Sequence, residues 1–589
     1  MHRFTRRIAG IGIAAVCAAA ALAAPAAQAD PGNGQGSGNG KGQFPLMDLQ
    51  ILSFNDFHGN LVPPSGSSAR LNAPDGSPIN NVGGVEYLAT HLKQAREGHD
   101  NTITVAAGDL VGATPLLSAA FHDEPTIESM NLLGLDASAV GNHEFDEGYK
   151  ELQRLQNGGC IDDGAGKDNQ DSCPDGSFDG ADFQYLAANV IEKSTGKTVL
   201  PAYKIINRNG AKVAFIGMTL EATPNIVTAA GVAGLEFKDE VETANALVPE
   251  LRKQGVKAII VLVHEGGFPP APQAYNYTCD GETSISGPIV EIAENLDPQI
   301  DMVISGHTHL PYVCNIPDPD GNDRLVTSAS SFGRLYTETN LRYNLRSNDI
   351  IRGSVAGSNL IVTRNVPKDT DQTTLINKYN VLVAPVANRV IGSITTNVTR
   401  ATNAGGESQL GDLIADAQLA DPSVVGPYAE PVIAFMNPGG IRADLTYASS
   451  LAGEGDGVVT FGEAFSVQPF NNYLVSLTMT GAQIKTLLTQ QWSGANAASP
   501  KVLQVSDGFA YSYSGTTLGA VTLNGAPLVD GQTYRIVTNN FLADGGDGFA
   551  SFKDGQDKFF GGLDIDAFAN YLEDNSPYTP GPLDRITKN

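Results

Sequence analysis

The chain of 589 residues carries 64 acidic residues against 37 Lys plus Arg, which gives a formal net charge of −27. Hydrophobic residues make up 41%, a share that is typical of globular proteins and excludes a disordered polyelectrolyte. The acidic balance argues against binding to duplex nucleic acid or to an anionic membrane, because both need a basic surface. At roughly 150 residues per domain, the length predicts two to four domains.

The N-terminal segment has the pattern of a secretory signal peptide over residues 1–29. Three arginines precede an apolar run, and a small-residue cleavage pattern follows it: Arg3, Arg6 and Arg7, then Ile8 to about Ala24, then Ala27-Gln28-Ala29. We therefore expect a secreted protein cleaved near Ala29, and both the general and the twin-arginine export routes remain open. Residues 30–46 form a Gly-rich tether, and no later apolar stretch predicts a membrane span.

From residue 47 to about residue 365, short β-branched runs alternate with segments of helical spacing. The expected strands include Leu49–Phe54, Thr102–Ala106, Val213–Ile216, Ala258–Val263 and Met302–Ser305, and the expected helices Val85–Arg96 and Val241–Gln254. Strands that alternate with helices indicate an α/β layer structure.

A second α/β domain is expected over residues 390–589, after a linking helix over residues 366–389. Its expected strands include Pro431–Met436, Tyr473–Met479 and Tyr534–Val537, and its expected helices Leu410–Leu419 and Ala482–Gln490. Because the chain contains neither His nor Cys beyond Cys314, a metal site with nitrogen or sulfur ligands must lie in the first domain.

Five blocks of the first domain share one pattern, in which a β-rich run is followed by a turn and a polar side chain. These side chains are Asp56 and His58; Asp109; Asn142, His143 and Asp146; His264; and His307 and His309. Ligands of open α/β sheets collect at the carboxyl ends of the strands, so the five blocks are expected to converge. The mixture of imidazole, carboxylate and amide suits two divalent metal ions such as Mn, Zn or Co, and a metal pair suits in-line displacement at phosphorus.

The order Asp-x-His, Gly-Asp, Gly-Asn-His-Glu, His and Gly-His-x-His resembles the calcineurin-like metallophosphoesterase signature. GNHEFD, together with NPGGIRADL and NNFLADGGDGF in the second domain, resembles the secreted 5′-nucleotidases more narrowly. This resemblance implies a four-layer αββα sandwich followed by a mixed α/β substrate-binding domain. It also implies a hydrolase that releases phosphate from nucleoside 5′-monophosphates by in-line attack of metal-bound hydroxide.

The resemblance also implies roles for individual residues. Asp56, His58 and His309 would hold one metal, Asn142, His264 and His307 the other, and Asp109 would bridge them. His143, oriented by Asp146, would stabilise the transition state or donate a proton.

In the second domain, Arg442 would bind the substrate phosphate or carboxylate, and Phe470 and Phe541 would sandwich the base. Asn472 would contact the base, and Asp547 would bind the ribose hydroxyls. Some relatives carry additional arginines before the block ESQLGDLIADAQ, whereas the preceding TNAGG here has none. The preference among mono-, di- and trinucleotides is therefore open.

Four cysteines follow the signal segment, an even number that favours two disulfides in an exported chain. Three connectivities are possible. We expect Cys160 to pair with Cys173 and Cys279 with Cys314, because each pair flanks a polar, loop-like insertion. Zinc ligation is the alternative, but no Cys-x-x-Cys spacing supports it.

The nearest functional alternative is an enzyme that hydrolyses other phosphoesters, namely UDP-sugars, 2′,3′-cyclic nucleotides or NAD. Such an enzyme would use the same metal chemistry and differ in the pocket of the second domain. A catalytically idle surface or adhesive scaffold is the alternative from another class. The small-molecule partner is expected to be a nucleotide, and the oligomeric state is left open. His91, His99 and His122 are interpreted as solvated residues without a role.

Overall fold

The computed structural model describes residues 46–64, 66–162, 164, 166, 169–228, 230–279, 284–449 and 453–589. The expected signal peptide and nearly all of the tether lie outside these residues, and Leu46 already belongs to the first strand. Within the described part of the chain, we find no helix with both the length and the apolar character needed to cross a bilayer.

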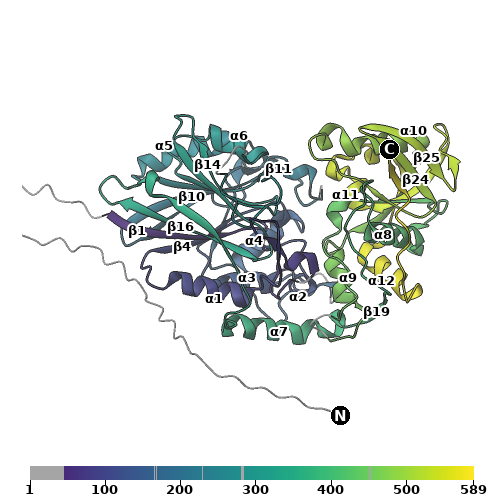
Figure 1. The fold of residues 1–589 in the computed structure, drawn as a ribbon, viewed down its shortest axis with the longest axis horizontal. Coiled ribbons are helices and arrows are strands. Elements are labelled where there is room, and N and C mark those ends of the chain that lie inside the picture. The colour runs from purple at the N-terminus through teal and green to yellow at the C-terminus, as the bar shows by residue number, and fades with distance from the viewer. Residues whose placement is uncertain are drawn as a thin grey trace, which may run out of the picture. The chain divides into compact units, whose positions relative to one another are not determined.

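The first domain is built on two sheets (Figure 1). One has the order β17-β16-β1-β4-β5-β6, with β18 also paired to β16: β17 (Asp349–Ile350), β16 (Leu335–Asn344), β1 (Leu46–Phe54), β4 (Thr102–Ala107), β5 (Ala137–Ala139), β6 (Gln184–Leu186) and β18 (Ala356–Ile361). The other has the order β14-β15-β13-β12-β10-β9: β14 (Pro311–Pro317), β15 (Asp323–Ala329), β13 (Met302–Ser305), β12 (Ala258–His264), β10 (Ala211–Thr219) and β9 (Tyr203–Arg208).

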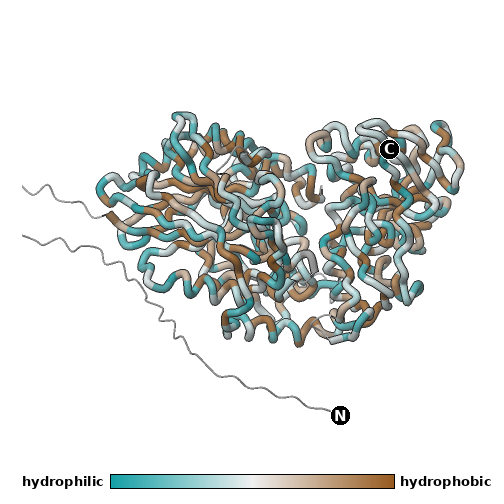
Figure 2. Tube along the Cα trace, viewed as in Figure 1, coloured by the Kyte–Doolittle hydropathy of each residue, from teal (hydrophilic) through white to brown (hydrophobic). Residues whose placement is uncertain are grey.

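Alternating side chains of the strands build the layers, since successive residues of a strand point to opposite faces. Ile51 packs with Val213 and Ile260 in a cluster shared by the two sheets, whereas Leu52 belongs to a different cluster on the opposite face. The central strands are therefore buried on both faces. Figure 2 shows hydrophobic residues as brown segments within the domain.

Helices cover the outer faces of both sheets. Beside the first sheet lie α1 (Val85–Arg96), α2 (Leu116–Ala119), α3 (Glu124–Leu133) and α4 (Tyr149–Asn157), and beside the second α5 (Glu240–Lys253) and α6 (Pro288–Asn295). The order helix, sheet, sheet, helix confirms the expected four-layer αββα arrangement. Small pairings complete the domain: β2 (Leu71–Asn72) with β3 (Pro78–Ile79), and β7 (Val190–Glu192) with β8 (Lys197–Thr198) and β11 (Leu235–Phe237).

The expected linking helix is α7 (Thr370–Ala387). Asp369 caps its first turn, because its carboxylate accepts hydrogen bonds from the backbone N–H groups of Asp371 and Gln372. Buried residues of α7, including Tyr379, belong to the same hydrophobic cluster as α1 and α3. The linker is therefore packed against the first domain.

The second domain is also α/β. Its main sheet has the order β23 (Gln504–Val505), β20 (Ile433–Met436), β27 (Thr533–Asn539), β22 (Tyr473–Thr480) and β28 (Gln556–Leu563). Smaller sheets are β26 (Ala526–Pro527), β25 (Thr517–Leu523), β24 (Phe509–Ser514) and β29 (Ile586–Lys588), and the pair β19 (Val390–Ser393) and β21 (Val458–Thr460). Its helices include α8 (Gln409–Ala420), α9 (Phe461–Val467), α10 (Gly481–Thr489), α11 (Asn540–Ala543) and α12 (Asp564–Asp574).

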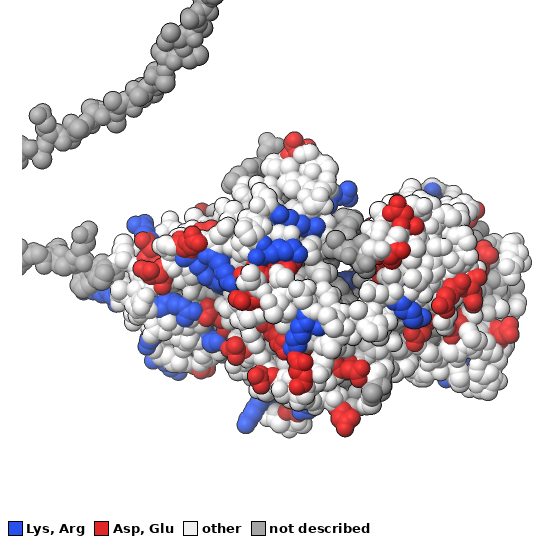
Figure 3. Space-filling view, turned by 90° about the horizontal axis from the view of Figure 1, so that it is seen from below, with Lys and Arg blue, Asp and Glu red and all other residues white. Residues whose placement is uncertain are grey.

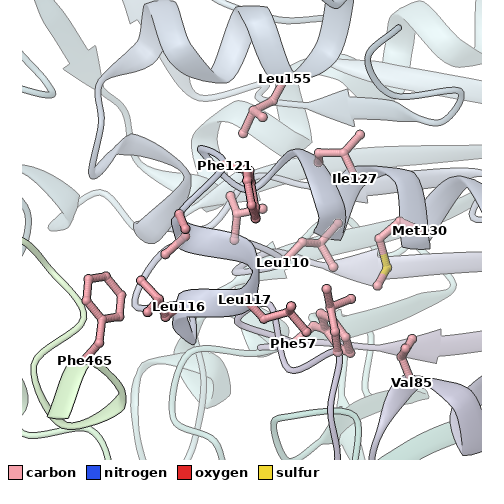
Figure 4. Close-up of a cluster of buried hydrophobic side chains, with 14 of the residues drawn as sticks. Phe57, Val85, Leu110, Leu116, Leu117, Phe121, Ile127, Met130, Leu155 and Phe465 are labelled. Atoms are coloured by element: carbon pink, nitrogen blue, oxygen red, sulfur yellow. The ribbon is translucent and has the colours of Figure 1, made fainter. Parts of the chain in front are cut away.

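The largest hydrophobic cluster contains residues of both domains. Figure 4 shows Phe465 of α9 beside Leu116 of α2, with Phe121, Ile127 and other labelled side chains of the first domain in the same cluster. Burying apolar side chains from both domains stabilises this contact, at roughly 25 cal/mol per Å² removed from water. On the surface, Figure 3 shows Lys and Arg interspersed with Asp and Glu.

Candidate metal centre and substrate cavity

The seven proposed metal ligands follow or end five strands of the two main sheets. Asp56 and His58 follow β1, Asp109 follows β4, Asn142 follows β5, His264 ends β12, and His307 and His309 follow β13. Within each sheet these strands run parallel, β1 beside β4 and β4 beside β5, and β12 beside β13. Their carboxyl ends therefore lie at the same edges, which is why residues up to 253 positions apart in the sequence can meet.

Five of these seven residues have left-handed backbone conformations: Asp56, His58, Asp109, His307 and His309, with φ between 47° and 68°. Such angles are uncommon outside glycine and cost free energy, so they persist only where the surroundings enforce them. The strand-to-turn geometry that aims these side chains is therefore strained at each of these positions.

The first group of ligands consists of Asp56, His58 and His309. His309 Nε2 lies 3.2 Å from Asp56 Oδ1 and 3.1 Å from His58 Nε2. Asp56 and His58 are fully buried, and His309 is half-buried.

The second group consists of Asp109, His264 and His307, with Asn142 beside it. His264 Nε2 lies 2.9 Å from Asp109 Oδ2, and His307 Nδ1 lies 3.0 Å from the side-chain oxygen of Asn142. Asp109 Oδ2 also lies 3.6 Å from His58 Nε2 of the first group. Asp109 therefore stands between the two groups.

Two backbone oxygens orient the imidazoles. His58 Nδ1 lies 2.8 Å from the carbonyl of Gly112, and His264 Nδ1 lies 2.7 Å from the carbonyl of Ala107. A carbonyl can only accept, so each Nδ1 donates a proton and each Nε2 turns towards the cluster. This is the arrangement that a metal-binding imidazole requires.

The donor set fits divalent metal ions. His264 Nε2 is buried and faces Asp109 Oδ2 at 2.9 Å, and the Nε2 atoms of His58 and His309 face each other at 3.1 Å. Burial favours the neutral form of His264, but the Asp109 carboxylate outweighs it and raises the pKa of His264 to about 10. A proton thus occupies a position that a cation would take, and metal binding would release it.

Glu144 supports the site, although the sequence analysis gave it no role within GNHEFD. Its carboxylate accepts hydrogen bonds from the backbone N–H groups of Asp109 (2.9 Å), Leu110 (2.8 Å) and Gly141 (2.5 Å). It therefore fixes the loops that carry Asp109 and Asn142. Asn55 has a similar function, since its amide nitrogen donates to Asp56 Oδ2 at 2.6 Å.

His143 lies at the edge of the cluster. Its Nδ1 is 2.7 Å from Asp146 Oδ2, and its backbone N–H donates to Asp109 Oδ1 at 2.9 Å. Burial lowers the pKa of His143, but the charges of Asp146 and Asp109 outweigh burial and raise it. The imidazole of His143 is therefore protonated more readily than a free imidazole.

A cavity of about 190 Å³ adjoins the metal ligands. Its wall brings together residues of both domains, namely Asn142, His143, Asp146, Ile226, Val227, Thr228 and His307 from the first and Asn437, Gly439, Gly440, Arg442, Phe470, Asn472, Lys501, Phe541 and Asp547 from the second. All five substrate-binding residues suggested by the sequence thus line one cavity. The ring of Phe470 stacks on His143 with centroids 5.6 Å apart, and the Arg442 guanidinium lies 5.8 Å from the same phenyl ring.

Two further residues of the wall, Asn437 and Lys501, escaped the sequence analysis. Asn437 lies inside NPGGIRADL, so the motif could have indicated it, whereas Lys501 lies in SPKVLQV, which carries no recognised motif. Arg400, the arginine nearest to TNAGG, donates to the backbone oxygen of Arg442 at 2.8 Å. It thus supports the Arg442 backbone.

The cysteines lie in the expected pairs, Cys160 with Cys173 and Cys279 with Cys314. The interpretation of His122 as a solvated residue was wrong. Only 6% of its surface is exposed, and its Nδ1 lies 2.6 Å from Glu147 Oε2. The spacing of His122 gave no sign of this partner, because Glu147 lies 25 residues further along the chain, in the segment before α4. His91 is half-buried beside the carbonyl of Thr363, and His99 is exposed as expected.

Comparisons with known proteins identify two family domains in this chain. Residues 49–311 match the family described as calcineurin-like phosphoesterase, and residues 390–554 match the 5′-nucleotidase C-terminal domain. The chain is 34% identical over 558 residues to the cell wall protein Lmo0130 of Listeria monocytogenes, which covers 89% of this chain and 67% of that protein. It is 30% identical over 498 residues to the endonuclease YhcR of Bacillus subtilis, covering 84% of this chain and 37% of that longer protein.

Among solved structures, the 5′-nucleotidase precursor of Thermus thermophilus superposes with a TM-score of 0.72 at 25% identity, covering 92% of this chain and 99% of that one. Fold and family matches together define a hydrolase of the metallophosphoesterase class. The chain belongs to the 5′-nucleotidase family, in which a calcineurin-like domain is followed by the 5′-nucleotidase C-terminal domain.

Proposed function

We propose that this protein is a two-metal phosphohydrolase that releases phosphate from nucleoside 5′-monophosphates. One observation carries the proposal: two neighbouring ligand groups, with Asp109 standing between them, adjoin a cavity that is lined by Asn142 and His307 and also by Phe470, Phe541 and Asp547. A nucleotide is the substrate class that needs both a phosphate site and an aromatic site for a base.

In this proposal, Asp56, His58 and His309 would hold one divalent ion, and Asn142, His264 and His307 would hold the other. Asp109 would be the ligand common to both. When bound, such a metal pair lowers the pKa of a water molecule and neutralises the charge of the phosphate. The mixed nitrogen and oxygen donors suit Mn, Zn or Co.

The side chains of the chain itself position the substrate. Arg442 lines the cavity, and in this proposal its guanidinium binds the phosphate oxygens. A planar guanidinium suits this role because it can donate two parallel hydrogen bonds to a phosphate. His143, held by Asp146, donates a hydrogen bond or a proton to the phosphate oxygens or the leaving group. Phe470 and Phe541 offer two half-buried rings on which a base stacks, worth ~1–3 kcal/mol per base and tolerant of base identity.

We also propose that the protein acts outside the cell. The signal pattern of residues 1–29 and two disulfides, which persist in oxidising compartments, support this location. A 34%-identical relative carries the name cell wall protein. Extracellular nucleotides would then be the available substrates.

The test is phosphate release from AMP by the purified protein, after chelation and after resupply of Mn, Co, Zn or Mg. We expect the chelated protein to be inactive and at least one metal to restore activity, with two metal ions bound per chain. If phosphate is released from UDP-glucose, a 2′,3′-cyclic nucleotide or NAD but not from AMP, the two-metal proposal stands and the proposed substrate is wrong. If no phosphoester is hydrolysed, the catalytically idle scaffold is favoured.

A further inference from the structure

The cavity wall contains a cation for which the sequence offered no explanation. Of the described residues that line the cavity, two are Lys or Arg, namely Lys501 and Arg442. Arg442 belongs to NPGGIRADL, whereas Lys501 reaches the cavity from the segment before β23. The backbone N–H of Lys501 donates to the Gln491 carbonyl at 2.9 Å, which fixes the start of the side chain.

Lys501 forms an ion pair inside this cavity. Its Nζ lies 2.5 Å from Oδ1 of Asp547, whose side chain is only 9% exposed. The other oxygen, Oδ2, accepts a hydrogen bond from the side-chain amide of Asn437 at 2.9 Å. Each carboxylate oxygen therefore has one donor from the protein and keeps a further lone pair for a ligand.

A chain of hydrogen bonds fixes this carboxylate from the protein side. Asn539 donates to the side-chain oxygen of Asn437 at 3.1 Å, and its own oxygen accepts from the backbone N–H of Leu542 at 2.8 Å. Asn496 holds the backbone carbonyl of Asp547 at 2.8 Å. Because Asp547 has a left-handed φ of 55°, this network also stabilises an uncommon backbone conformation. The carboxylate is thus oriented before any ligand binds.

We propose that Lys501 is a positioning residue for Asp547, the carboxylate to which the family resemblance already assigns the ribose hydroxyls, and that Lys501 fixes this carboxylate so that the cavity selects nucleotides with a free 2′,3′-diol. The inference rests on the proposed nucleotide function and deepens it. A carboxylate with two fixed oxygens accepts from two vicinal hydroxyls, and a buried acceptor left without its donor is costly. A 2′,3′-cyclic phosphate lacks both donors and brings a negative charge to the carboxylate, so it is selected against.

Binding tests the selectivity without turnover. Calorimetry on the wild-type protein with adenosine and with 2′,3′-dideoxyadenosine should show at least about tenfold tighter binding of adenosine. Equal affinities, or no binding of either nucleoside, would overturn the inference. If adenosine is preferred but AMP is not hydrolysed, the proposed function fails and the diol site stands.

Kinetics test the role of Lys501. In Lys501→Met we expect the KM for AMP to rise about tenfold, the loss typical of a charge-assisted contact, with kcat within about twofold. The KM for 2′,3′-dideoxy-AMP should rise much less, and Lys501→Arg should restore most of the loss for AMP. Lys485→Met is the matched control, because Lys485 forms a 2.6 Å ion pair with Asp530 on the surface of the same domain.

Equal losses on AMP and 2′,3′-dideoxy-AMP would indicate a general structural effect and reject the positioning role, as would no loss on AMP. Asp547→Asn gives a second variant that keeps the shape and removes the charge. Because the pair acts as a unit, the double variant with Lys501→Met should lose little more than either single variant. Additive losses would contradict the coupling.

Discussion

Asp109 has more contacts with the proposed ligands than its place in a short Gly-Asp motif suggests. One carboxylate oxygen faces His264 and His58, and the other accepts the backbone N–H of His143. Burial would raise the pKa of Asp109, but the surrounding imidazoles outweigh it and lower the pKa well below its ordinary value. The carboxylate is therefore available to a cation across the neutral pH range.

Asp109→Ala should remove the ligand that we propose the two metal ions share, because this carboxylate faces His58 of one group and His264 of the other. We expect metal content to fall from two ions per chain to one or none, and phosphate release to fall about 10³-fold, the several kcal/mol that a metal pair supplies. Metal analysis and initial rates measure the two effects. Asp48→Ala, at an exposed position of β1, is the control. A variant that keeps both ions and full activity would contradict the bridge.

At the scale of elements, the His122–Glu147 pair connects the turn before α3 to the segment before α4. Glu151 and Arg154 of α4 also face His122. Burial lowers the pKa of His122, yet the hydrogen bond and charge of Glu147 outweigh it and raise the pKa above 6.5. In turn, burial raises the pKa of Glu147, and the His122 contact outweighs this and lowers it below 4.5.

The pair should therefore stabilise the fold in a pH-dependent way. A raised His pKa gives stability that is complete below 6.5 and disappears as the pH rises through the folded-state value. A lowered Glu pKa gives stability that is present above 4.5 and disappears as the pH falls. His122→Ala should thus cost most between these values, on the order of 1 kcal/mol, because His122 is buried but its partner Glu147 is exposed to solvent, which screens the pair.

Denaturant unfolding of the wild type and His122→Ala at pH 5.5 and pH 9 measures this difference. The gap between the two proteins should shrink at the higher pH, and the remainder reflects lost packing. His99→Ala, at an exposed position, should show no such pH-dependent gap. A gap of constant size would show that the charge of His122 contributes nothing.

At the scale of the whole molecule, the cavity is formed by both domains, which also share the hydrophobic contact of Leu116 and Phe465. A substrate must enter between residues that are contributed by separate domains. We therefore expect the domains to rotate about the segment after α7 during turnover.

A covalent link should slow this motion. Ser68 and Arg400 meet across the domains, with Oγ and Nη2 3.4 Å apart, so cysteines at both positions can be joined by a short bismaleimide. We expect kcat for AMP to fall at least about tenfold in the linked protein, because lid and domain motions often limit turnover. The two single-cysteine variants, treated with the same reagent, are the controls. Unchanged kinetics in the linked protein would argue against the hinge.

Much of the molecule could be predicted from local pattern. The strands and helices of both domains begin and end within a few residues of their expected positions, for example Met302–Ser305 and Val85–Arg96. Alternating apolar residues determine which strands are buried, and polar residues directly after such strands must meet where parallel strands end. For this reason the seven ligand candidates were visible as a set.

Only the tertiary structure shows the contacts between residues that do not belong to the same sequence motif. Glu144 binds backbone groups 34 and 35 residues away, Lys501 meets Asp547 46 residues further along, and His122 is buried by a partner 25 residues away. Such pairs depend on how loops cross in space, which neither periodicity nor motif spacing encodes. The sequence by itself determined which side chains could form the proposed metal site, and the fold decided which other side chains hold them in place.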